Sequence, residues 1–422
     1  MTSLARPNRN ADAIEVVVAG GGAAGIGAAR TLAAAGVKAR IVEARDRLGG
    51  RAWTISSSQG FSIDLGCGWL HAAERNPWRA IAEAKGWAID HAPPPWMRAI
   101  APRGDVVPGQ AAFGRALFEF RQRVADFSES APDGSAADFI PKDSPWRPML
   151  DAVSSFYSGA ELERISARDL ARYDDTALNW RLERGYGALV ADHGVGLEVS
   201  YSTRVTRIDR SGKRLRVETD GNGTLVADCV VVTLPTNVLA ATPELFAPSL
   251  PEKVEAAIGL PLGLADKLYL ALDGADDFRS ESRQFGRTDT ATTAAYHFRP
   301  LGRPVVEAYF GGETARALEA GGEAAFVDFA VAELVAALGS DMAKRLRPAA
   351  FHAWGRDPLA MGSYSYAVPG HADDRAALAE PVDGRIFFAG EACSEVDYST
   401  AHGAYISGVK AAAEILDTLA GE

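Results

Sequence analysis

The feature that most constrains this chain is a glycine-rich turn between a short apolar strand and an alanine-rich segment. Ile14–Ala19 has the β-branched pattern of a buried strand, and Gly20-Gly21-Gly22-Ala23-Ala24-Gly25 follows it directly. The alanine-rich segment predicts a helix ending near Gly36, and Val37–Val42 predicts a second strand that ends at Glu43. In such a β-α-β unit the helix N-terminus binds a pyrophosphate, and the carboxylate after the second strand accepts hydrogen bonds from a ribose. The unit therefore predicts a dinucleotide site, without separating NAD from FAD.

Three glycines of this turn have separate steric tasks. Gly20 permits the tight turn, Gly22 lets the backbone approach a pyrophosphate, and Gly25 lets the helix pack closely against the strand. The helix presents free N–H groups and the positive end of its dipole to the phosphates.

Composition excludes several classes of function. The chain has 422 residues and a net charge of −11 with no basic cluster, so a nucleic-acid partner is not expected. Three scattered cysteines fit neither a disulfide framework nor a metal site, and they favour a reducing compartment. Met1–Ala13 lacks the apolar core of a secretory signal, and no run reaches the ~18 apolar residues of a membrane span. We expect a soluble, cytoplasmic monomer or homodimer that contacts no membrane.

The middle of the chain differs from its two ends in its pattern of loop, helix and strand residues. Pro93–Pro95 and Ala131–Pro148 are loop-like, while Ala111–Phe127 between them predicts a helix. Asp220-Gly221-Asn222-Gly223 has the composition of a hairpin turn between two strands. Further strands are predicted over 197–201, 204–208, 214–219, 229–234, 264–272 and 385–389, and further helices over 323–338 and 403–419. One domain is therefore expected to be built from both ends of the chain, with a second formed by the middle.

The segment after the second strand separates the two cofactors. It reads Glu43-Ala44-Arg45-Asp46-Arg47-Leu48-Gly49-Gly50-Arg51 and resembles the E-A-x-x-R-x-G-G-R fingerprint of the flavin-containing amine oxidase family. The resemblance implies that FAD is the cofactor and that Gly49, Gly50 and Arg51 approach its pyrophosphate and flavin edge. It also implies an α/β fold, with a Rossmann-like FAD-binding domain interleaved with a mixed-sheet α+β substrate domain. The expected FAD-binding domain comprises 1–75, 187–260 and 372–422, and the substrate domain comprises 76–186 and 261–371.

A second block carries a candidate active-site histidine. Ile63-Asp64-Leu65-Gly66-Cys67-Gly68-Trp69-Leu70-His71, followed by Asn76-Pro77, resembles the segment that lines the flavin ring in polyamine oxidases. A lone histidine is most often structural, but His71 falls on the active-site histidine of that family. Ala72 stands where the family has glycine. Downstream, Val231-Val232-Thr233-Leu234-Pro235 resembles the family's V-x-P sequence, and Val205 matches a residue whose backbone contacts adenine.

Lys267 lies in a predicted strand in which alternation separates it from three leucines. Leu264, Leu268 and Leu270 share one face, and Lys267 lies on the other. A strand lysine is ordinarily solvated. In the family, however, such a lysine holds a water against flavin N5, and a cation there favours electron transfer to O2.

The C-terminal blocks narrow the branch of the family. Trp354, Gly362-Ser363-Tyr364-Ser365-Tyr366, Phe388-Ala389-Gly390-Glu391 and Tyr398-Ser399-Thr400-Ala401-His402-Gly403-Ala404 all resemble family segments. They imply that Glu391 lies at the ribityl–pyrophosphate part of FAD and that the last helix points its N-terminus at the flavin. Monoamine oxidases carry a cysteine that bonds covalently to the flavin, just before the segment that matches Gly362–Tyr366. No cysteine stands there in this chain, so noncovalent FAD is expected. Monoamine oxidases and plant polyamine oxidases have a tyrosine at the position of Thr400, so this part of the sequence is more similar to spermine and acetylpolyamine oxidases. Lysine-specific histone demethylases share the threonine but lack the histidine found at His71.

The resemblance predicts that a neutral amine, favoured to be a polyamine or related secondary or primary amine, is oxidised to an imine that hydrolyses to an aldehyde. O2 is then reduced to H2O2. Oxidation of a monoamine, amino acid or alkaloid, a flavin desaturase, and a non-catalytic FAD scaffold remain alternatives. The expected catalytic residues are Lys267, His71, Tyr364 and Thr400. The expected cofactor contacts are Gly20, Gly22, Ala23, Ala24, Gly25, Glu43, Ala44, Arg45, Gly49, Gly50, Arg51, Gly66, Cys67, Gly68, Trp69, Val205, Trp354, Gly390, Glu391, Thr400 and Ala401.

Overall fold

The first layer of the fold is a parallel sheet assembled from distant parts of the chain. The computed structural model describes residues 15–97, 100–104, 109–221 and 223–421. The Met1–Ala13 stretch, Ile14 of the predicted first strand and Asn222 of the predicted turn lie outside them. The strand order is β20-β11-β1-β2-β7. These strands are β1 (Val16–Ala19), β2 (Ala39–Val42), β7 (Val199–Ser200), β11 (Cys229–Val232) and β20 (Ile386–Phe388). Both ends of the chain therefore contribute strands to one sheet, as predicted.

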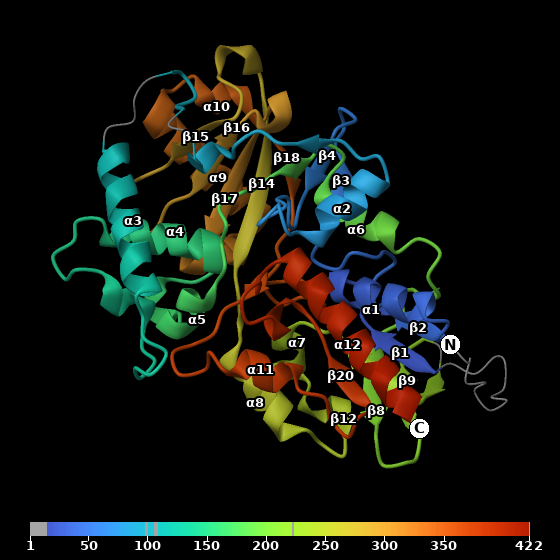
Figure 1. Cartoon of the computed structure of the whole chain (residues 1–422). Helices are drawn as coiled ribbons and strands as arrows, with labels where there is room; N and C mark the ends of the chain where they lie inside the picture. Colours follow the sequence, from blue (N-terminus) through green and yellow to red (C-terminus); the bar gives the residue numbers. More distant parts are fainter. Residues whose placement is uncertain (1–14, 98–99, 105–108, 222, 422) are drawn as a thin grey trace.

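Both faces of the parallel sheet are covered, which explains its unbroken apolar strands. Val16 and Val18 of β1 pack in a core with α1 (Ala23–Ala34) and α12 (Ala401–Gly421), which lie side by side in Figure 1. Val17 packs on the opposite face, in a core shared with a second sheet of order β10-β9-β8-β12. All four residues of β1 are buried.

The predicted hairpin turn joins different strands from those expected. It connects β9 (Leu215–Thr219) to β10 (Thr224–Ala227), and these two strands are antiparallel. On its other side β9 pairs with β8 (Val205–Asp209), also antiparallel, and β8 pairs in parallel with β12 (Phe246–Ala247). The strand over 229–232, expected to be the partner, lies instead in the parallel sheet. Sequence reasoning missed β10 because three of its four side chains are at least partly exposed, so it carries little apolar signal.

The third layer is a sheet of order β15-β16-β17-β14-β18. Its strands are β14 (Ala265–Leu272), β15 (Ser282–Phe285), β16 (Ala295–Phe298), β17 (Val305–Gly311) and β18 (Leu346–Phe351). Every pairing in it is antiparallel, so the expected mixed sheet is wrong here. The physical reason is topological: β15, β16 and β17 follow one another as neighbours, and the crossover after β17 places β18 on the far side of β14. One face packs on α9 (Gly312–Leu338), through residues such as Leu268, Phe310 and Phe326.

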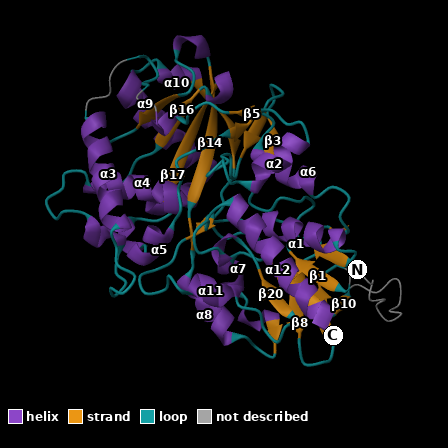
Figure 2. Ribbon diagram, viewed as in Figure 1, coloured by secondary structure: helices purple, strands orange, loops and turns teal. Residues whose placement is uncertain are grey.

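The sequence predicted one of the three helices that group on one side of the molecule and missed the other two. The predicted helix over 111–127 is α3 (Gln110–Ala125), and it lies beside α4 (Arg147–Ser158) and α5 (Ala167–Arg172) on one side of the molecule (Figures 1 and 2). The remaining elements are α2 (Pro77–Ala84), α6 (Tyr186–His193), α7 (Thr236–Ala241), α8 (Pro251–Gly259), α10 (Met342–Arg345), α11 (Asp374–Ala379), β3 (Thr54–Ser56), β4 (Ser62–Asp64), β5 (Ile89–Asp90), β6 (Arg181–Leu182), β13 (Leu262–Gly263) and β19 (Tyr364–Ser365). Among the described residues, no helix combines the length and the apolarity needed to cross a bilayer.

Candidate active site

A cavity of about 960 Å³ runs from the ends of the parallel strands to one face of the antiparallel sheet. Every predicted site residue except Gly25 lines it. The structure thus gathers positions as distant in sequence as Gly20 and Thr400 around one space, while their contacts with a cofactor or substrate stay predictions. A largely apolar cavity with a few convergent polar groups is the usual form of a small-molecule site.

The glycine turn forms an open cradle at one end of the cavity. Gly20 has a φ of +110°, and a side chain there would lie 2.5 Å from the hydroxyl of Thr233. A Cβ at Gly25 would lie 2.0 Å from the carbonyl oxygen of Gly20 and 3.2 Å from Val18, so only glycine fits there. Gly25 faces this turn and strand rather than the cavity. At Gly22, by contrast, a Cβ would meet nothing within 4 Å. Gly22 is also the N-cap of α1 and makes no side-chain cap, so the first N–H groups of the helix suit a phosphate.

Glu43 joins this cradle to the loop that follows the second strand. One carboxylate oxygen accepts from the backbone N–H of Gly21 at 2.6 Å, and the other accepts from the N–H of Arg45 at 2.7 Å. Burial raises the pKa of Glu43, although these two N–H groups oppose the rise. The carboxylate is held rigidly, and each oxygen keeps a lone pair for a ribose hydroxyl.

Arg51 connects the second glycine pair to the C-terminal part of the chain. Its Nη1 donates to the carbonyl of Ser363 at 2.8 Å and to Glu391 Oε1 at 3.0 Å. Glu391 also accepts from the hydroxyl of Ser365 at 2.6 Å and from the N–H of Ser399 at 2.9 Å. Burial opposes ionisation of Glu391, but Arg51 and Ser365 outweigh it and lower its pKa. Glu391 therefore fixes three backbone segments, leaving few lone pairs for a ligand.

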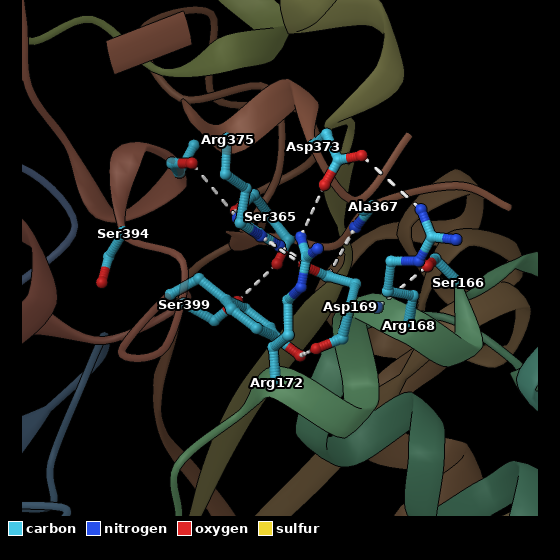
Figure 3. Close-up of polar contacts among 12 residues, drawn as sticks. Ser166, Arg168, Asp169, Arg172, Ser365, Ala367, Asp373, Arg375, Ser394 and Ser399 are labelled. Carbon is cyan, nitrogen blue, oxygen red and sulfur yellow. Dashed lines mark hydrogen bonds and ion pairs between the residues drawn. The ribbon is translucent and has the colours of Figure 1, made fainter. Parts of the chain in front are cut away.

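A fully buried ion pair continues this network toward α5. The guanidinium of Arg375 donates to both carboxylate oxygens of Asp169, at 2.6 and 2.8 Å, and neither residue is exposed (Figure 3). Arg375 also donates to Ser365 Oγ at 3.0 Å, and its guanidinium lies 3.8 Å from the ring centroid of Tyr398. Ser365 adjoins the predicted site residue Tyr364, and Tyr398 lies two residues before the predicted site residue Thr400. The pair therefore holds in place the loops that line the cavity.

His71 is held in one tautomer. Its Nδ1 lies 2.6 Å from Asn179 Oδ1, and the amide nitrogen of Asn179 donates to the carbonyl of Ala177. Because that second bond orients the amide, His71 must donate from Nδ1, which leaves Nε2 as an acceptor. Burial lowers the pKa of His71, so the ring is neutral at pH 7. Ala72, which replaces the family's glycine, adopts the left-handed conformation that glycine favours, with a φ of 47°.

Lys267 carries its charge beside a carboxylate. Its Nζ lies 3.2 Å from Glu307 Oε1 and donates to the carbonyl of Asp64 at 3.2 Å. Burial lowers the pKa of Lys267, but neighbouring groups, including Tyr269 and Glu307, outweigh it and hold the pKa above its ordinary value. The predicted alternation is confirmed, since Leu268 and Leu270 belong to the core against α9 while Lys267 lines the cavity.

Aromatic side chains form the wall near Lys267. Tyr364 donates from its hydroxyl to the carbonyl of Phe156 at 2.5 Å, and its oxygen lies 3.0 Å from that of Tyr309. Trp354 is buried and donates from Nε1 to the carbonyl of Leu65 at 3.1 Å. Both predicted aromatic residues are thus fixed by hydrogen bonds while still lining the cavity.

Two further predicted residues are Thr400, which has a structural role, and Cys67, which is protonated. Thr400 caps α12: its hydroxyl donates to the carbonyl of Asp397 at 2.6 Å and accepts from the N–H of Gly403 at 2.9 Å. The helix accordingly begins at Ala401 rather than at the expected Gly403. Burial raises the pKa of the Cys67 thiol to about 12, so this cysteine lines the cavity in its unreactive form.

Sequence reasoning missed several residues that the fold brings to the cavity, among them Arg121, Tyr157, Arg283, His297, Glu307 and Tyr309. The strand register supplies the missing signal for the last two of these. Tyr309 stands directly opposite Lys267 in the β14–β17 pair, and Glu307 stands opposite Tyr269. Their positions depend on a pairing that local alternation does not specify.

Comparison with known proteins agrees with this geometry. The family model described as flavin containing amine oxidoreductase matches residues 23–416. Polyamine oxidase 2 of Arabidopsis thaliana is 31% identical over 438 residues, which cover 94% of this chain and 87% of that protein. Probable polyamine oxidase 4 of the same plant is 30% identical, over 94% and 86% of the two chains. Lysine-specific histone demethylase 1 homolog 1 of Oryza sativa subsp. japonica is 31% identical, over 95% of this chain and 52% of that protein. This chain therefore belongs to the family of flavin-containing amine oxidoreductases and uses FAD as its cofactor.

Proposed function

We propose that the protein oxidises the CH–NH group of an amine to an imine, which water hydrolyses to an aldehyde, while O2 is reduced to H2O2. The observation that carries this proposal is the continuous cavity, which links the phosphate cradle at Gly22 to the polar groups of His71 and Lys267. FAD, when bound, accepts the electron pair and hydrogen from the carbon next to the nitrogen and delivers the electrons to O2.

The cavity residues fit FAD. The open cradle at Gly22 accepts the pyrophosphate, Glu43 accepts from the adenosine ribose, and Val205 lines the adenine end. The strand order β20-β11-β1-β2-β7 supports a Rossmann-like sheet with FAD at its carboxyl edge. We assign 1–75, 187–260 and 372–422 to the FAD-binding domain, and 76–186 and 261–371 to the substrate domain. Cys67 keeps its proton, which supports noncovalent binding.

His71 gives the cavity an acceptor for the substrate nitrogen. Only a neutral amine has the lone pair that assists loss of hydrogen from the neighbouring carbon. The neutral imidazole accepts an N–H hydrogen bond through Nε2 without requiring a charged ammonium. Tyr364 and Tyr309 flank the approach, and their linked hydroxyl groups keep both rings in fixed orientations. Thr400 contacts the substrate nitrogen or an ordered water through its hydroxyl oxygen. The same hydroxyl group also caps α12.

The relatives named polyamine oxidases make polyamines the first substrates to test. Assignment to the spermine and acetylpolyamine branch, a cytoplasmic location, and a monomeric or homodimeric state belong to the same proposal.

The reaction can be tested with purified protein reconstituted with FAD. Anaerobic mixing with a panel of polyamines, monoamines, amino acids and amino carboxylates should bleach the flavin absorbance with at least one class. Admission of O2 should then restore the absorbance and release H2O2 in proportion to the aldehyde formed. Failure of every amine to bleach the flavin would refute the amine oxidase proposal. Bleaching followed by recovery without H2O2 would refute O2 reduction to peroxide.

A further inference from the structure

The antiparallel sheet carries a row of polar side chains along its cavity face. In the strand register Arg283 stands opposite His297, His297 opposite Glu307, and Glu307 opposite Tyr269. Directly opposed residues point to the same face, so this row shares its face with Lys267, two residues along β14. Arg283, His297 and Glu307 all line the cavity.

Most charges in this row are neutralised within the protein. Glu307 pairs with Lys267 at 3.2 Å. His297 lies 2.8 Å from Glu281, and Glu281 also accepts from Arg181 at 2.7 Å. At Glu307 and His297, therefore, the protein itself supplies the opposite charges.

Arg283 is the exception. Its guanidinium lies 4.1 Å from the ring centroid of Phe285, yet among the described residues no carboxylate pairs with it and no acceptor takes a hydrogen bond from its side chain. Burial lowers its pKa, and the nearby group that opposes this effect is the phenol of Tyr157. A half-buried guanidinium facing a cavity without a partner is costly unless a ligand supplies the anion.

A second cation and a free hydroxyl lie at the same end of the cavity. Arg121 of α3 lies 5.5 Å from the ring centroid of Tyr157 and also lines the cavity. Within the described part of the chain, neither the Tyr157 hydroxyl nor the Arg121 side chain has a hydrogen-bonded partner. Two guanidinium groups and a phenol together match the donors that bind carboxylates.

The carboxylates that line the cavity do not offset these arginines. Glu43 and Glu391 are bound to backbone N–H groups, and Glu307 is paired with Lys267. The other two lining carboxylates, Asp175 and Glu244, are exposed. An extended polyamine is a polycation at neutral pH, because each of its ammonium groups titrates near ~10. Arg121 and Arg283 would repel such a chain at this end.

We propose that Arg283, Arg121 and Tyr157 form a carboxylate subsite, so that the substrate is an amine bearing a carboxylate at the end remote from the reacting nitrogen. Arg283 lies three strands from Lys267 in the order β15-β16-β17-β14, and two residues along the strand from the position in register with it. Their backbones are therefore roughly 16 Å apart, at about 4.8 Å per strand and about 3.4 Å per residue. The substrate is accordingly a long-chain amino carboxylate. This inference rests on the proposed amine oxidation, and it replaces a polyamine by an amino carboxylate as the preferred substrate.

The test compares matched substrates that differ only at the remote end, for example ω-aminooctanoate, diaminooctane and N-acetyl-diaminooctane, together with shorter and longer homologues. The wild-type enzyme should show the highest kcat/KM with an amino carboxylate. Arg283→Met keeps an unbranched stem over Phe285 and should raise KM for that substrate about 10- to 150-fold, with kcat little changed, because a charge-assisted contact is lost. Arg283→Lys should retain part of the affinity. Octanoate should inhibit the wild type competitively, and the Met variant much more weakly.

Arg287→Met is the matched control, because Arg287 is exposed, pairs with Asp289 and does not line the cavity. It should leave every kinetic constant unchanged. Arg121→Met is the second test of the subsite, for use if Arg283→Met loses FAD or has a lower Tm. Arg121 is exposed on its helix, so this change leaves the fold intact. Equal turnover of the three remote ends, or a preference for the diamine, would overturn the subsite while leaving amine oxidation intact. Absence of flavin bleaching with every amine would instead refute the proposed function itself.

Discussion

Replacing Lys267 by methionine tests whether its charge serves the reaction of the reduced enzyme with O2. Methionine keeps the apolar stem and removes the ammonium that lies 3.2 Å from Glu307. Since the pKa of Lys267 is held above its ordinary value, the wild-type group is charged throughout the working pH range. A fixed cation stabilises the negative charge that develops on O2, and loss of one such group in a dry site costs ~2.7–4 kcal/mol. The rate of flavin reoxidation should therefore fall about 10²- to 10³-fold, with flavin reduction much less affected.

The structure also predicts a cost in stability, which must be separated from the chemical effect. Without Lys267, the largely buried carboxylate of Glu307 loses its closest cation and, among the described residues, keeps only His297 as an ion-pair partner, whose Nδ1 lies 3.7 Å away. Removing one partner of such a pair costs roughly 3–5 kcal/mol. For a chain of 422 residues this corresponds to a fall in Tm of about 3 to 6 °C. The double variant Lys267→Met, Glu307→Gln removes both charges, so it should regain most of the stability but none of the reoxidation rate.

The assay is stopped-flow absorbance. Each enzyme is reduced anaerobically with substrate and then mixed with oxygenated buffer, while the return of the oxidised flavin spectrum is followed. Slow reduction combined with normal reoxidation would mean that Lys267 acts on the amine. Normal rates in both half-reactions would place Lys267 away from the flavin, and recovery of the reoxidation rate in the double variant would show that the defect came from the unpaired carboxylate.

Three further predictions address the cofactor, the fold and the pH dependence. Glu43→Ala should weaken FAD binding about 10- to 150-fold, because a buried charge-assisted contact of ~1.5–3 kcal/mol is lost; unchanged flavin retention after dialysis would count against the assignment. Asp169→Asn should lower stability by about 3–5 kcal/mol, because the guanidinium of Arg375 is fully buried and no longer has a charged partner; a thermal melt like that of the wild type would contradict this. The kcat/KM for an amine should rise with pH toward about 10 as the substrate loses its proton. Because the pKa of His71 is lowered, the ring stays neutral over that rise, so His71→Gln should reduce kcat/KM without changing the pH profile; a shifted profile would show that His71 titrates during turnover.

The residues that sequence alone identified are those whose role follows from local geometry. The glycines at 20, 22 and 25 each meet a steric requirement that can be stated from a strand, a tight turn and a helix. The placement of Lys267 away from the leucine face follows from the two-residue period of a single strand. The helix over 110–125 was predictable because its signal lies within one continuous segment.

Tertiary structure decided the contacts between segments far apart in the chain. Asp169 and Arg375 are 206 residues apart, and His71 and Asn179 are 108 apart, so no local pattern links either pair. The position of Arg283 in the cavity wall depends on which strands are neighbours, and the burial of the whole sheet face against α9 selects that order. A strand's own alternation determines which side chains share a face, but only the packed core determines what that face meets.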